Sequence, residues 1–313
     1  MNKNNIFYLL SVYFLSLITA IVLNNGLSLK NSGEVYISKG KSTTGIINMF
    51  YDGGFIYDRF AFRTLKSLGG FSFKSGEYKI SKNDNPINIL INVDNHKVFY
   101  RKIKILEGST IRELVQNIEQ NKYLTGKVHI PNDTLIFADT YYFERGTKVS
   151  KLLEDIKKVF SEKSNQIWQS RDKSVPVKDI KQAYILASII EKETGQISEQ
   201  KIVSSVFVNR LNKNMKLQSD PTVIYAVTNG LSKMDRPISK KDLRTKSPYN
   251  TYYVRGLTPT PIAIVGISAF KASLNPENTN YLYFVANGQG GHNFAKTLKQ
   301  HNKNVRFYRS LKQ

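Results

Sequence analysis

The sequence has 313 residues, no cysteine and a formal net charge of +22, because 46 Lys and Arg residues outnumber 24 Asp and Glu residues. This length can bury a substantial core and suits an elongated protein of two domains. The absence of cysteine excludes disulfides and thiolate sites. The basic charge favours either a polyanionic partner or a general compositional bias towards Lys, Asn and Ile. Nucleic acid is disfavoured as that partner, since the lysines are dispersed and no nucleic-acid motif is present.

The N-terminal segment predicts insertion into a membrane. Residues Ile6–Leu23 form an uncharged apolar run of 18 residues, close to the ~20 residues that cross a bilayer. Lys3 precedes the run, which favours a cytoplasmic segment at 1–5 and export of everything that follows. A cleaved signal peptide is the alternative, but residues 19–21 make a poor cleavage site. We therefore expect a single-pass transmembrane anchor over 6–24 in the inner (cytoplasmic) membrane, with the rest of the chain extracytoplasmic (periplasmic).

Two further regions follow the anchor. Residues 35–175 are expected to form a small mixed domain, in which FKSGEYKIS, INILINV and KVFYRKI predict strands. An amphipathic helix over Leu152–Trp168 ends this region. Residues 176–313 show mainly helical patterns with a few strands. The predicted fold class is therefore α+β.

The helix that begins near Ala183 carries ionisable side chains where chemistry can be expected. On a helix that advances 100° per residue, Glu193 lies near the middle of an apolar face, whereas Glu191 projects to the opposite side with Tyr184 and Ser188, where a carboxylate is usually solvated. That face consists of Ala183, Leu186, Ile189 and Ile190. A carboxyl group there, beside the negative end of the helix, should have a raised pKa and suit a general acid. A frayed helix end with Glu193 in water is the alternative.

The segments after this helix add polar groups. Ser198 can cap a second helix, and Asp220 followed by Pro221 can begin a third, with Asp220 as the cap and Gln218 in the loop before it. SPYNTY places Tyr249 and Asn250 in a loop suited to gripping a saccharide, although an ordinary turn explains it equally.

Three other kinds of site are disfavoured. The glycine-rich turn NGQGGHNF carries His292, but it lacks the Lys-Ser/Thr spacing of a phosphate loop. No convincing metal pair is formed with His301. No serine nucleophile motif is present.

A series of segments resembles the YceG/MltG family of membrane-anchored endolytic murein transglycosylases. The segments match in order from about Phe73 to His301: LASIIEKETG, VSSVFVNRL, LQSDPTVIY, SPYNTY, GLTPTPIAIVG, LYFVANGQGGHNF and the late His301. FADTYYFERG also resembles a family segment, with Ala138 in place of a proline. No single motif is decisive, but the series is highly specific.

The resemblance implies a LysM-like fold for the mixed domain and a catalytic domain at 176–313. It implies cleavage of peptidoglycan (murein) glycan strands beside the synthases that make them, with no metal or other cofactor. Glu193 would be the catalytic acid/base. The other implied substrate-binding residues are Gln218, Tyr249, Asn250 and His292, which would line the groove, and Glu191 and Asp220, which would assist electrostatically.

The residues leave two alternatives open. Ordinary glycosidases need two carboxylates, whereas a lytic transglycosylase needs one that acts first as acid and then as base. A hydrolase that uses Glu193 with Asp220 as the water-activating base is the first alternative. The second is a membrane-tethered cell-wall binding protein without turnover.

Overall fold

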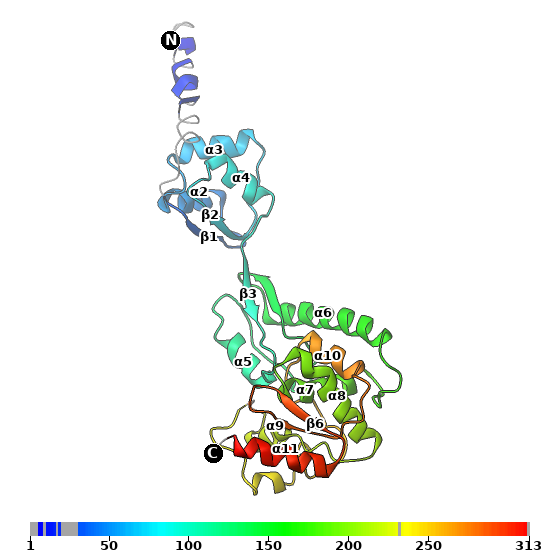
Figure 1. The fold of residues 1–313 in the computed structure, drawn as a ribbon. Helices are drawn as coiled ribbons and strands as arrows, with labels where there is room; N and C mark the ends of the chain where they lie inside the picture. Colours follow the sequence, from blue (N-terminus) through cyan, green and yellow to red (C-terminus); the bar gives the residue numbers. More distant parts are fainter. Residues whose placement is uncertain (1–5, 9–10, 17, 20–30, 231–232, 312–313) are drawn as a thin grey trace. The chain divides into compact units, whose positions relative to one another are not determined.

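The computed structural model describes residues 6–8, 11–16, 18–19, 31–230 and 233–311 (Figure 1). The chain is a mixture of helices and short strands, as the predicted α+β class requires. In chain order the elements are β1 (Gly33–Ile37), α2 (Thr43–Asp52), α3 (Arg59–Leu68), β2 (Gly76–Ile80), α4 (Pro86–Asp94), β3 (Tyr100–Lys104), α5 (Ile111–Glu119), β4 (Thr140–Glu144), α6 (Val149–Gln169), α7 (Ile180–Glu193), α8 (Ile197–Asn212), α9 (Asp220–Thr228), the short 3-10 helix η1 (Asp242–Arg244), α10 (Ile267–Leu274), β5 (Tyr283–Ala286), β6 (His292–Ala295) and α11 (Leu298–Ser310).

The prediction of an N-terminal transmembrane helix is wrong. Within the described ranges, no helix is long and apolar enough to cross a membrane. Parts of the predicted anchor, 6–8, 11–16 and 18–19, are helical among the described residues. The rest of the predicted anchor and the predicted cytoplasmic segment, 1–5, lie outside the described residues.

The chain divides into two compact units. The first comprises residues 1–101 and 142–146, and the second comprises 102–141 and 147–313. Strands β3 and β4, which pair with each other, therefore contribute residues to both units. The predicted boundary between residues 175 and 176 and the LysM-like character of the region before it stay predictions.

The first unit contains a two-stranded antiparallel sheet and the helices α2, α3 and α4. Strands β1 and β2 pair in a register that sets Val35 opposite Tyr78, and both side chains join a core that includes Phe50 and Phe62. The segment INILINV, predicted as a strand, is helix α4 instead. Asn85 caps it and Pro86 begins it, because a proline in the first turn has no amide hydrogen to leave unpaired.

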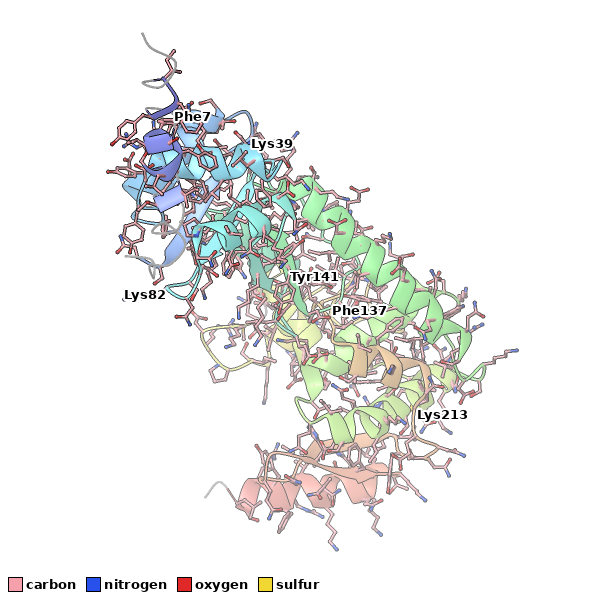
Figure 2. The ribbon with its side chains drawn as sticks, turned by 90° about the horizontal axis from the view of Figure 1, so that it is seen from above. Phe7, Lys39, Lys82, Phe137, Tyr141 and Lys213 are labelled. Carbon is pink, nitrogen blue, oxygen red and sulfur yellow. The ribbon has the colours of Figure 1, made fainter. Side chains whose placement is uncertain are left out.

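The second unit is organised around α7, which packs against α8, α9 and α10 (Figure 1). One apolar cluster joins α7 to α8. A second cluster on the other side of α7 is aromatic and contains Phe137, Phe160, Tyr184 and Phe270. In Figure 2 the neighbouring side chain of Tyr141 lies beside Phe137, and its hydroxyl donates a hydrogen bond to the Phe137 carbonyl at 2.8 Å. Burial on two sides makes α7 a rigid support for the residues at its C-terminal end.

The C-terminal strands form a small antiparallel hairpin covered by α11. Strands β5 and β6 pair with Ala286 opposite His292, and α11 packs on both strands. The predicted glycine-rich turn is the connection between them. It brings His292 to the first position of β6.

Candidate active site

Glu193 is the last residue of α7. Asp179 caps the other end of this helix by accepting a hydrogen bond from the amide of Gln182, and Thr194 ends the helix in an extended conformation. The Glu193 side chain is half-buried, and its Oε1 accepts a hydrogen bond from the hydroxyl of Ser219 at 2.5 Å. The predicted position on the apolar face of the helix is therefore what removes this carboxyl group from bulk water.

Ser219 belongs to a buried hydroxyl network at the start of α9. It occupies the N-cap position without using its side chain as a cap, which leaves the hydroxyl for Glu193. Its amide donates to Oγ1 of Thr251 at 3.0 Å. The hydroxyl of Thr222 donates to the Ser219 carbonyl at 2.6 Å and lies 2.8 Å from Oγ1 of Thr251. These contacts fix Ser219, and through it the rotamer of Glu193.

The environment of Glu193 favours the protonated acid without excluding the carboxylate. Burial raises its pKa from the ordinary 4.5 to about 7, and the nearby charge of Asp220 adds to this rise. The Ser219 hydrogen bond and the positive charge of Arg210 act in the opposite direction. With a pKa of about 7, the group can lose and regain a proton near neutral pH, as one residue acting as both acid and base must.

Arg210 of α8 is the buried cation of the site. Only 7% of it is exposed, and its guanidinium donates to the carbonyls of Leu282 at 2.6 Å and Leu217 at 2.8 Å. It also lies over the ring of Tyr283, 5.3 Å from the centroid. Because backbone carbonyls hold it in place, its charge is fixed relative to Glu193.

Asp220 and Gln218 flank Ser219 on the exposed side. Asp220 is the first residue of α9 and not its cap, and its Oδ1 accepts a hydrogen bond from the hydroxyl of Tyr252 at 2.6 Å. Burial and this hydrogen bond raise the pKa of Tyr252 well above its usual range. Gln218 is exposed with a left-handed backbone, φ 47°, which turns the chain into α9.

Glu191 has a different environment from the solvated one expected. It belongs to a polar row on α7 that receives backbone amides from the segment before α10. Ser188 accepts from Ile262 at 3.1 Å, the hydroxyl of Tyr184 from Val265 at 3.3 Å, and Oε2 of Glu191 from Gly266 at 2.9 Å. Burial raises the pKa of Glu191. Its carboxyl group therefore anchors the N-terminus of α10.

Tyr249 and Asn250 lie in one loop, but their side chains do different things. The half-buried Tyr249 lies 2.8 Å, hydroxyl to hydroxyl, from Thr260, and its ring centroid is 5.0 Å from that of Tyr225. Asn250 is fully buried. Its amide donates to the carbonyls of Leu243 and Thr245, and its side-chain oxygen accepts from the amide of Tyr252. Asn250 thus holds the loop that carries Tyr252.

His292 is held by a carboxylate that the sequence interpretation did not single out. Both oxygens of Glu199 in α8 are used: Oε1 accepts from the backbone amide of His292 at 2.9 Å, and Oε2 lies 2.7 Å from its Nδ1. The imidazole also packs edge-on against Phe284, with centroids 5.2 Å apart. The same turn is tied to α8 by Gln196, whose amide donates to the Gly290 carbonyl at 2.7 Å.

The structure brings four of the discussed residues into one electrostatic group: Glu193, Asp220, Tyr252 and Arg210. Sequence reasoning missed Ser219, Arg210 and Glu199 as functional residues, and it included Tyr252 only as part of the SPYNTY loop that could grip a saccharide. Ser219 and Tyr252 stand inside motifs already quoted, so their position beside Asp220 and Asn250 was the available signal. Arg210 also stands inside a quoted motif, VSSVFVNRL. Glu199 gave no signal, since a charged residue on a helix is usually solvated. Among the described residues, no three His, Asp or Glu side chains gather as metal ligands.

These features define an α+β protein with a half-buried, protonatable carboxyl group, that of Glu193, at a helix end, surrounded by hydroxyl and aromatic groups. The chain belongs to the YceG-like family, whose model matches residues 35–307.

Named relatives agree with this membership. A Bacillus subtilis (strain 168) protein named endolytic murein transglycosylase is 32% identical over 316 residues, which cover 90% of this chain and 86% of that protein. A protein of the same name from Streptococcus pneumoniae (strain R6) is 30% identical over 176 residues, which cover 54% of this chain but 31% of that longer protein. A crystal structure of a yceG-like protein from Listeria monocytogenes matches with a TM-score of 0.53 and 28% identity, over 88% of this chain and 99% of that one.

Proposed function

We propose that this protein is an endolytic peptidoglycan lytic transglycosylase in which Glu193 is the acid and base. The Bacillus subtilis relative, which is matched over 90% of this chain, and the family support the reaction class. The observation that carries the assignment of the residue is the half-buried Glu193 carboxyl group, whose pKa is raised to about 7 by burial at the end of a helix packed on two sides. A group poised in this way serves acid–base catalysis near neutral pH.

The reaction breaks the bond between C1 of N-acetylmuramic acid and the bridging oxygen. Protonated Glu193 gives its proton to that oxygen, so that N-acetylglucosamine leaves with a free hydroxyl. The C6 hydroxyl of the same muramic acid unit then attacks C1, and the Glu193 carboxylate takes its proton. The product carries a 1,6-anhydro ring, no water is consumed, and Glu193 ends protonated. Because the nucleophile belongs to the substrate, its proximity replaces a second catalytic carboxylate.

The surrounding groups suit both halves of this cycle. Burial and the Asp220 charge favour the acid form that begins the reaction. The Ser219 hydroxyl and the Arg210 charge favour the carboxylate that exists after the proton has left. Tyr252 links Asp220 to the same group through its hydroxyl. Gln218, Tyr249 and His292 remain proposed groove residues, on the strength of the family motifs that contain them.

Three further roles are part of the proposal. The protein acts in the extracytoplasmic compartment, since its substrate lies there. It works beside peptidoglycan synthases and ends nascent strands by internal cleavage, as the family resemblance implies. The mixed domain, 35–175, binds the glycan through a LysM-like fold.

The test is mass spectrometry of purified peptidoglycan digested by the full chain, with a Glu193→Gln control. Fragments that end in 1,6-anhydromuramic acid, absent from the control, are expected. Products with reducing ends would contradict the proposal and indicate a hydrolase, in which Asp220 is the candidate base that activates water. Intact glycan in both digests would contradict the proposed enzyme activity and indicate a cell-wall binding protein without turnover.

A further inference from the structure

An open pocket of about 410 Å³ lies beside the last turn of α7 in the second unit. It is lined by the loop between β3 and α5, by α5 and by Lys192, the residue immediately before Glu193 in the sequence. We call it the lysine pocket and define it by its charged and amide side chains: Lys104, Glu107, Glu113, Asn117, Lys192 and Lys233. Its volume falls in the range of ligand-binding clefts, roughly 300–1,000 Å³.

The wall of the lysine pocket is held in place by backbone contacts. The amide of Gly108 donates to the Ile264 carbonyl at 2.9 Å, and the amide of Ile264 donates to the Ser109 carbonyl at 2.7 Å. The first turn of α5 is closed by a capping box between Thr110 and Glu113. The pocket therefore exists before any ligand arrives.

The charges in the pocket favour an anionic ligand. Three ammonium groups stand against two carboxylates, and one of these, Glu113, already accepts the Thr110 amide at 2.8 Å. Lys192 is half-buried, and its Nζ donates to the Gly108 carbonyl at 3.2 Å. Burial lowers its pKa, and the charges of Glu113 and Glu191 act in the opposite direction. A carboxylate in the pocket would act in the same direction as these two charges, through a charge-assisted hydrogen bond.

The substrate of the proposed function carries such groups on the sugar that is cleaved. N-acetylmuramic acid bears a peptide on its O3 lactyl group, and this peptide contains several carboxylates and one side-chain amine or amide. The scissile bond is at C1 of the same sugar. Lys192 and Glu193 are consecutive residues in the last turn of α7, and their side chains diverge by about 100° around the helix. An extended peptide spans ~3.3–3.6 Å per residue, so a peptide of several residues on the cleaved sugar is long enough to follow this turn.

We propose that the lysine pocket binds the carboxylate-bearing peptide of the muramic acid unit that is being cleaved. Lys192 holds a peptide carboxylate, with Lys233 and Lys104 around it, while Glu107 faces the peptide's amine. This inference rests on the proposed function and adds the requirement for a peptide-bearing strand.

The experiment compares kcat/KM of the full chain on peptide-bearing glycan strands and on the same strands stripped of peptide by an amidase. Wild-type protein should prefer the peptide-bearing strands by roughly tenfold, the worth of one charge-assisted hydrogen bond. Lys192→Met should bring that ratio close to one, and Lys233→Met should lower it. Lys213→Met removes an exposed lysine, labelled in Figure 2, that does not line the pocket, and it should keep the wild-type ratio.

Each outcome decides something. Wild-type protein that cuts both substrates equally well overturns the lysine pocket and leaves the proposed function standing. Wild-type protein that cuts neither overturns the proposed function itself. A folded Lys192→Met protein with the wild-type ratio also overturns the pocket. If circular dichroism shows that Lys192→Met does not fold, Lys233→Met, at an exposed position, becomes the test. An unchanged ratio of kcat/KM between the two substrates in that variant would then contradict the proposal.

Discussion

The hydroxyl of Ser219 donates a hydrogen bond to Oε1 of Glu193 at 2.5 Å, across 26 residues of sequence. Ser219 stands at the N-cap of α9 but its side chain makes no capping bond. A serine cap typically contributes ~1 kcal/mol to helix stability. α9 lacks this contribution, because the Ser219 hydroxyl donates to the Glu193 carboxyl group. The neighbouring Asp220 acts on the same group in the opposite sense, because its charge raises the Glu193 pKa.

The two neighbours should therefore shift the pH–rate profile in opposite directions. Glu193 must be protonated to begin the reaction, so kcat/KM should fall as the pH rises through about 7. Ser219→Ala removes a bond that lowers the Glu193 pKa, so this limb should move to higher pH, with a plateau rate lower by roughly tenfold. Asp220→Asn removes a charge that raises the pKa, so the limb should move to lower pH. Initial rates between pH 5 and 9 measure both effects. Shifts in the same direction, or none, would contradict the assignment of this limb to Glu193.

The raised pKa of Glu193 should also cost folding stability at neutral and alkaline pH. Its pKa is about 7 in the folded chain against an ordinary 4.5, so the folded state binds the proton more tightly than the unfolded state. Below pH 4.5 the Glu193 carboxyl group is protonated in both states, and its ionisation costs the folded state no stability. As the pH rises to about 7, the free energy of unfolding falls, because the unfolded state loses this proton first. Above pH 7 the fall is roughly 3 kcal/mol, at 1.36 kcal/mol per pKa unit.

Glu193→Gln tests this cost, because an amide does not titrate. Urea unfolding should give the variant a free energy of unfolding about equal to that of the wild type at pH 4.5, and higher by up to ~3 kcal/mol at pH 8. Cleavage should fall by roughly 10²–10⁴-fold, as for other general acids. Glu119→Gln, at an exposed position on α5, is the matched control and should change neither quantity. A pH-independent difference between Glu193→Gln and wild type would show that the carboxyl group is not protonated by its site.

Glu191 should contribute to stability more than to turnover. Its Oε2 accepts the amide of Gly266, the N-cap residue of α10, and burial makes an unpaired amide there costly. Glu191→Ala should destabilise the fold by roughly 1–3 kcal/mol, whereas Glu191→Gln keeps an acceptor oxygen and should lose less than half of that. Thermal unfolding measures both. If Glu191→Ala were as stable as wild type but lost cleavage, the electrostatic role implied by the family resemblance would be the better interpretation.

The contrast between Glu191 and Glu193 shows what helical periodicity can and cannot predict. The apolar stripe correctly placed Glu193 on a buried face of α7. It failed for Glu191, because Tyr184 and Ser188 look like a solvated face in sequence, although they bind backbone amides of a segment that lies nearly 80 residues later. Such partners are set by tertiary packing, which a local pattern does not contain.

Two other differences have local causes. The alternation in INILINV fits a strand, but Asn85 and Pro86 form a helix start. The amide of Asn88 donates a capping hydrogen bond to Oδ1 of Asn85, which favours α4. Asp220 was expected to cap α9, and the helix starts one residue earlier, with Ser219 at the cap position. The motif predicted the place of the helix to within one residue, but not that the Ser219 side chain would bond to Glu193 in place of capping α9.

The last prediction concerns the imidazole of His292. Because Oε2 of Glu199 lies 2.7 Å from Nδ1 and a carboxylate only accepts, the neutral ring should carry its proton on Nδ1 and present Nε2 as an acceptor. Nitrogen NMR of ¹⁵N-histidine-labelled protein should show this tautomer, and Glu199→Ala should shift the ring towards the Nε2-protonated form that free histidine prefers.

The same variant, Glu199→Ala, should lower cleavage by about tenfold if His292 lines the groove, because the orientation of the imidazole ring is then lost. Glu162→Ala, on the exposed side of α6, is the control and should leave the signal and the rate unchanged. A shifted tautomer with full activity would remove His292 from the groove, and an unshifted tautomer would contradict the contact between Glu199 and His292 itself.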